Sequence, residues 1–129
     1  MDIFVRAFGD VADRDGIPVR RILLEAGGFR VAGDGSLDVA GTSVHGLPIA
    51  GRPFAGLKFA HVTDAVFELI VHVARTADMV ILPVGCPLCV VFEHQRAQLP
   101  EDMASHDVQL VETGEELAIV VRGALPSSG

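Results

Sequence analysis

Short stretches in which apolar and polar residues alternate, or in which β-branched residues cluster, follow one another along much of the chain. Such runs are typical of strands, and two of them around the turn at Gly33–Ser36 predict a hairpin. A second pair, joined through Thr113–Glu116, predicts another hairpin near the C-terminus. The predicted strands cover residues 1–8, 29–32, 37–40, 57–62, 79–92 (interrupted at Cys86–Cys89), 107–112 and 117–122.

Two other stretches repeat their apolar residues with the period of a helix. Over Pro18–Ala26, apolar residues recur at i, i+3, i+4 and i+7 from Val19, and Gly27 with Gly28 then supplies a stop signal. The stretch 63–77 is almost entirely apolar apart from one polar stripe. A helix of this kind should be covered over most of its circumference, either by a sheet and a long loop or by a partner subunit. The stripe consists of Asp64, Glu68, His72 and Thr76.

The order of these elements predicts an α+β domain, with a mainly antiparallel sheet and two principal helices packed on one face. The two strand–helix units suggest a ferredoxin-like or related split arrangement, extended by extra strands. One domain fits the length of 129 residues, and we expect it over residues 1–124 with a flexible tail at 125–129. Gly41–Gly56 is predicted to be a long loop, or a loop broken by a short strand, and such loops are often functional. A short helical turn is expected at Glu101–Ala104.

Negative charge is concentrated in one segment. The formal net charge is -7, and residues 93–116 hold seven carboxylates against a single basic residue, Arg96. This distribution argues against direct binding of nucleic acid, which needs a basic surface, and the chain has no Trp or Tyr for stacking on bases. It suits a surface that meets a basic partner protein, with solubility as the simpler alternative. The predicted partner-binding residues are Glu93, Glu101, Asp102, Asp107, Glu112, Glu115 and Glu116.

The longest uncharged run, Met79–Phe92, is 14 residues long and contains two prolines. A membrane-spanning helix needs about 20 apolar residues, so we expect this run to be buried as a strand and expect no contact with a membrane. Asp2 and Arg6 interrupt the apolar residues at the start of the chain, so no export signal is expected. The predicted location is cytoplasmic.

The two cysteines, Cys86 and Cys89, form a C-x-x-C motif. A redox pair needs its first cysteine at the start of a helix, whereas β-branched residues follow here. Residues three apart on an extended chain point to opposite faces, so we expect the sulfurs to lie apart and to pack as small apolar groups. The alternative is a metal site at Cys86, Cys89 and His94, with His106, although a structural zinc site usually has a second pair of ligands. We therefore expect no metal and no cofactor.

No stretch matches a nucleophile elbow or a phosphate-binding glycine loop, so no catalytic residue is predicted. The remaining acid–base candidates are histidines. His72 is explained by a pair with Glu68 one helical turn away. His45 and His61 could form a small-molecule pocket with Glu68 or with Asp64.

The opening strand MDIFVRAF, and the helix VFELIVHVARTAD that runs directly into the strand MVILP, resemble small immunity proteins of bacterial polymorphic toxin systems. The resemblance implies a non-enzymatic inhibitor that binds a cognate toxin and blocks its active site. We therefore expect a small acidic binding protein that inhibits a basic partner, with a homodimer as a further arrangement. The alternatives are a metal- or thiol-dependent protein that uses Cys86 and Cys89, and a small-molecule-binding domain.

Overall fold

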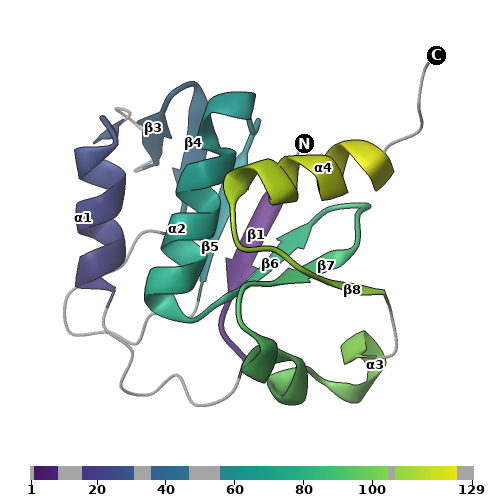
Figure 1. The fold of residues 1–129 in the computed structure, drawn as a ribbon. Helices are drawn as coiled ribbons and strands as arrows, with labels where there is room; N and C mark the ends of the chain where they lie inside the picture. The colour runs from purple at the N-terminus through teal and green to yellow at the C-terminus, as the bar shows by residue number, and fades with distance from the viewer. Residues whose placement is uncertain (1, 9–15, 31–35, 47–55, 105–106, 125–129) are drawn as a thin grey trace.

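The computed structural model describes residues 2–8, 16–30, 36–46, 56–104 and 107–124, and one sheet lies at its centre (Figure 1). The strands lie in the order β2-β3-β4-β5-β1-β6-β7-β8. They are β1 (Ile3–Arg6), β2 (Phe29–Arg30), β3 (Leu37–Val39), β4 (Thr42–His45), β5 (Gly56–Ala60), β6 (Val80–Pro83), β7 (Leu88–Val90) and β8 (Val108–Leu110). The helices are α1 (Ile17–Glu25), α2 (Phe67–Ala77), α3 (Glu101–Ala104) and α4 (Gly114–Ala124), with 3-10 turns η1 (Asp64–Val66) and η2 (Glu93–Gln98).

The strand pairings confirm an α+β protein, and its sheet is mixed. Neighbouring strands are antiparallel everywhere except between β7 and β8, which run parallel. Because β5 and β6 are each antiparallel to β1, they are parallel to each other, and α2 joins them in a split β-α-β unit around β1. The strands on either side of α1 do not form a second such unit, because β1 and β2 lie four positions apart in the sheet.

Helices α1, α2 and α4 cover one face of the sheet, with α2 in the middle (Figure 1). The expectation of two principal helices is therefore wrong. Beneath them, alternate residues of the strands are fully buried, as Ile3, Phe59 and Ile81 show. The flanking helices also explain why α2 is apolar around most of its circumference, since α1 and α4 bury the sides that the sheet does not reach. A partner subunit is not needed to cover it.

Residues 117–122 were predicted as a strand, but they lie in α4. Leu117, Ala118 and Val121 are buried at helical spacing. The preceding residues start the helix, because the Thr113 hydroxyl oxygen accepts a hydrogen bond from the Glu116 backbone N–H at 3.2 Å. This is the capping-box pattern of Thr followed three residues later by Glu. The supposed hairpin turn is therefore a helix cap.

Other predicted elements are confirmed at their places in the chain. The first helix and the turn at Glu101–Ala104 are present, and β2 pairs with β3 as a hairpin. The second predicted helix is present as the 3-10 turn η1 followed directly by α2. β4 occupies the first part of Gly41–Gly56, whereas residues 47–55, the turn at 31–35 and the tail at 125–129 lie outside the described residues. No described helix combines the length and apolar character that are needed to cross a membrane.

The face of the sheet opposite these three helices is divided into two halves. Over β6, β7 and β8, a second apolar cluster forms beneath Phe8, Leu99 and Met103, which come from outside the sheet. Over β1, β4 and β5, the strands present Phe4 together with polar side chains, among them Arg6 and Lys58. The second apolar cluster packs beneath β8, the edge strand whose neighbouring segments contain the predicted partner-binding residues.

Candidate functional site

Strand β8 forms one edge of the sheet and has a carboxylate near each end. Asp107 precedes the strand and Glu112 follows it, which places their α-carbons roughly 16 Å apart at the rise of an extended chain. Glu115 and Glu116 lie in the first turn of α4, directly after β8. The other three predicted residues lie before β8, on η2 and α3. All seven predicted carboxylates are exposed, but they surround an edge and do not form one compact patch.

Much of this negative charge is not compensated within the described part of the chain. Glu93 forms an ion pair with Arg96 at 2.9 Å, on the surface. Asp107 accepts a hydrogen bond from the Gln109 side chain at 2.8 Å, which is a neutral partner. Among the described residues, Glu112 and Glu115 have neither a hydrogen bond nor an ion pair through their carboxylates. The edge therefore presents net negative charge to any partner.

Only alternate residues along β8 direct their backbone N–H and C=O groups toward β7. Val111 donates its N–H to the Val90 carbonyl at 2.9 Å, so residues 109 and 111 turn their backbone groups toward β7. Val108 and Leu110 then turn theirs toward the open side. The Arg96 guanidinium donates a hydrogen bond to the outward-facing Val108 carbonyl oxygen at 3.3 Å. The N–H and C=O groups of Leu110 are left facing outward.

A cavity of about 330 Å³ opens beside the start of β8. Its walls are mainly apolar, and Asp107 is the acidic residue among those that line it. Such a cavity can take the aliphatic stem of a long basic side chain and place its charged head against the carboxylate. The lining residues are Leu82, Cys86, Pro87, Leu88, Met103 and Asp107.

The turn that contains Glu93 is held in place by a buried glutamine, Gln95, which sequence reasoning missed. Its side-chain oxygen accepts hydrogen bonds from the N–H groups of Val91 at 2.9 Å and Phe92 at 3.3 Å. Its side-chain nitrogen donates to the Asp78 carboxylate at 2.8 Å and to the Met79 carbonyl at 3.1 Å. The whole hydrogen-bonding capacity of the amide is used to join the end of β7 to the start of β6.

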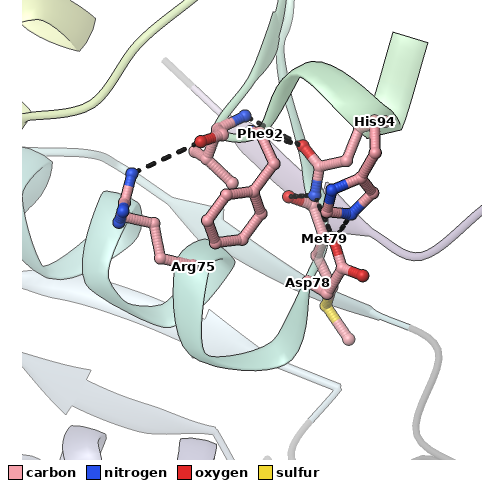
Figure 2. A network of polar contacts seen from close by, with 7 residues as sticks. Arg75, Asp78, Met79, Phe92 and His94 are labelled. Carbon is pink, nitrogen blue, oxygen red and sulfur yellow. Dashed lines mark hydrogen bonds and ion pairs between the residues drawn. The ribbon is translucent and has the colours of Figure 1, made fainter.

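His94 belongs to the same cluster as Gln95. Its Nε2 atom lies 2.8 Å from Asp78, and its ring stacks on Phe92 at a centroid distance of 5.3 Å (Figure 2). On the other side, the Arg75 guanidinium lies 4.8 Å from the centroid of the Phe92 ring. The described residues include no group of three or more His, Cys, Asp or Glu side chains that could hold a metal ion. His106, the remaining member of the metal alternative, lies outside the described residues.

Both cysteines contact the core on the helix side of the sheet, so the expectation that they point to opposite faces is wrong. The reason is that Cys86 lies in the turn between β6 and β7, where the chain is not extended. Its thiol lies 3.9 Å from the carbonyl oxygen of Val121 in α4. Burial raises the pKa of the Cys89 thiol to about 12, with Cys86 and Asp107 adding to the effect. Burial also raises the pKa of the Cys86 thiol. Neither thiol has the lowered pKa of a redox nucleophile.

Thiol labelling should separate the two cysteines. At pH 8, native protein is expected to react with iodoacetamide only at Cys86 and more slowly than a free cysteine peptide, because the thiolate is the reactive form. Cys89 should react only after unfolding, since its thiol is buried and its pKa is about 12. Mass spectrometry counts the labels. Rapid modification of both thiols in the native protein would contradict this assignment.

The histidine pocket predicted from the sequence is not assembled. His45 lies on the face of the sheet opposite the helices, whereas Glu68 is on α2 and accepts a hydrogen bond from the Gly114 N–H at 2.7 Å. His61 is exposed in the turn after β5, with a φ of 57°. These side chains therefore do not converge on one acid–base site.

No protein-family model, curated protein or solved structure matches this chain. The class that the fold and the candidate site define is an α+β protein with one open, acidic sheet edge.

Proposed function

We propose that this protein is a non-enzymatic binding protein of the cytoplasm that inhibits a basic partner protein, in the manner of a toxin immunity protein. The observation that carries the proposal is the β8 edge, where outward-facing backbone groups of Leu110 lie between exposed carboxylates. An exposed sheet edge can accept an extended segment of another protein as an added strand. Main-chain hydrogen bonds would give affinity, and the carboxylates would select a basic segment.

The charge around β8 favours a different protein over a second copy of this chain. Two β8 edges brought together would place like-charged carboxylates near one another, which disfavours self-pairing. A segment rich in Lys or Arg would instead be attracted along the whole edge. One of its long side chains would enter the cavity of about 330 Å³ beside Asp107. If that segment lies beside the active site of the partner protein, its binding to β8 would block the active site.

Charge reversal tests the proposal. Co-expression with the product of the neighbouring gene should yield a complex of equal stoichiometry on size-exclusion chromatography. The variant Glu112→Lys/Glu115→Lys/Glu116→Lys should weaken this complex by roughly tenfold or more, because three attractions become repulsions. Raising the salt concentration should weaken the wild-type complex in the same direction.

Two further variants make the result specific. Glu25→Lys changes an exposed carboxylate at the end of α1 and should leave the affinity unchanged. Leu110→Pro removes the outward-facing N–H but leaves the bonds from residues 109 and 111 to β7, so it should weaken the complex. Because Leu110 also packs against the second apolar cluster, thermal denaturation of this variant checks that the fold is kept. If neither the neighbouring product nor a basic protein binds, or if the triple variant binds equally well, the proposal is overturned.

A further inference from the structure

A hollow of about 390 Å³ lies on the face of the sheet opposite α1, α2 and α4, over β4, β5 and β1. The residues of its first row are His45, Lys58 and Phe4, which are direct neighbours across the three strands. In the next row, Arg6 lies opposite Gly56, and Gly46 follows β4. The hollow therefore has three side chains along one row, and Arg6 with two glycines along the other.

Two of the lining residues, Gly46 and Gly56, are glycines and contribute no side chain to the hollow. A side chain at Gly56 would approach the Val5 carbonyl oxygen to 2.6 Å, so this position requires glycine for the close approach of β5 to β1. Gly46 has a φ of 81°, in the region that favours glycine. A ligand can thus lie directly on the backbone of β4 and β5, with side chains beside it. A volume of this size lies in the range of small-molecule sites.

The charge of the hollow is opposite to that of the whole chain. Arg6 and Lys58 are cationic, and His45 can donate a hydrogen bond, within a protein of net charge -7. In the described part of the chain, neither Arg6 nor His45 has a hydrogen bond or an ion pair through its side chain. Lys58 forms an ion pair with Asp2 at 3.6 Å, and its ammonium group lies 5.8 Å from the centroid of the Phe4 ring. Arg6 is therefore available to a ligand.

We propose that this hollow binds a small anionic ligand, in which a phosphate or carboxylate group is attached to a planar apolar body. The planar guanidinium of Arg6 presents paired N–H donors that match such an oxyanion, and Lys58 adds a second positive charge. Phe4, a residue that is 36% exposed, offers an apolar surface for the body of the ligand. This site is separate from the β8 edge, so it does not depend on the proposed protein partner.

The test uses phenyl phosphate as the probe and records amide shifts by ¹H–¹⁵N NMR. We expect saturable shifts at Phe4, Arg6, Gly46 and Lys58 below about 10 mM. Inorganic phosphate should bind more weakly, because it lacks the ring, and neutral benzyl alcohol should cause no saturable shifts. Equal binding of inorganic and phenyl phosphate would overturn the role assigned to Phe4, and absence of saturable shifts would overturn the site.

Matched variants assign the binding to the hollow. Arg6→Gln should lower the affinity for phenyl phosphate by roughly tenfold or more, since a charge-assisted hydrogen bond is lost. Lys58→Gln should weaken it as well and serves if Arg6→Gln does not fold. Arg21→Gln removes the same charge from the exposed surface of α1 and should have no effect. Equal loss in Arg6→Gln and Arg21→Gln would show diffuse attraction to the surface and would overturn the proposal.

Discussion

Replacing Gly114 by alanine should lower the free energy of unfolding by roughly 3 kcal/mol or more. A Cβ atom at this position would overlap the backbone nitrogen and α-carbon of Glu68, which cannot move out of the way as a flexible side chain could. Helices α2 and α4 would have to separate. The hydrogen bond from the Gly114 N–H to the Glu68 carboxylate, at 2.7 Å, would be strained or lost. Thermal denaturation should show a fall of roughly 10–15 °C in the melting temperature.

The same helix offers a matched control. Gly123 also lies in α4, but a Cβ atom there would meet nothing within 4 Å. Gly123→Ala should therefore leave stability unchanged or raise it by about 0.5 kcal/mol, because alanine favours the helix. If both substitutions had equal effects, the close approach of α2 to α4 at Gly114 would be refuted. Urea titration of both variants gives the comparison directly.

Gln95→Leu is expected to cost about 3–5 kcal/mol of stability. Leucine has a similar volume but no polar atoms, so the N–H groups of Val91 and Phe92 and the carbonyl of Met79 would lose their partner in a buried place. Each such group costs about 1–3 kcal/mol when it is left without a hydrogen bond. Chemical denaturation measures the loss. Native-state hydrogen exchange should show faster exchange at the Val91 amide.

Gln98→Leu provides the control for this substitution. Gln98 lies in the same 3-10 turn, is exposed, and makes no side-chain hydrogen bond within the described part of the chain. The Gln98→Leu substitution should change the free energy of unfolding by less than about 0.5 kcal/mol. A cost for Gln95→Leu as small as this would mean that water replaces the amide, and that the cluster does not hold η2 in place.

Local periodicity was enough to predict most elements of this fold. Val19 and Leu23 lie on the stripe that defines α1, and the alternation of the first residues places Ile3 and Val5 toward the core. The strand predicted at 117–122 was wrong because Leu117–Val121 is a short apolar run rich in β-branched residues, which fits a strand as well as a buried helix. The Thr-x-x-Glu cap beginning at Thr113 was the local signal that separates the two readings.

The candidate sites were harder to predict, because strand register assembles them. The acidic segment could be recognised in the sequence. Its position at the edge of the sheet depends on the parallel pairing of β8 with β7, and no local pattern predicts that pairing. Arg6, His45 and Lys58 stand far apart in the chain and meet only because β1, β5 and β4 are neighbours. The burial of Gln95 likewise depends on Asp78 and Met79, which belong to another turn.

The central place of β1 has a consequence for how the chain folds during synthesis. Val5 pairs with Leu57 and with Ile81, which follow it by 52 and 76 residues. At a synthesis rate of about 5–20 residues per second, β1 waits roughly 4–15 s before its second neighbour is made. The antiparallel strands β2 to β5 can pair in order meanwhile, since each one follows its neighbour directly in the chain. The centre of the sheet therefore forms late, when β1 takes its place between β5 and β6.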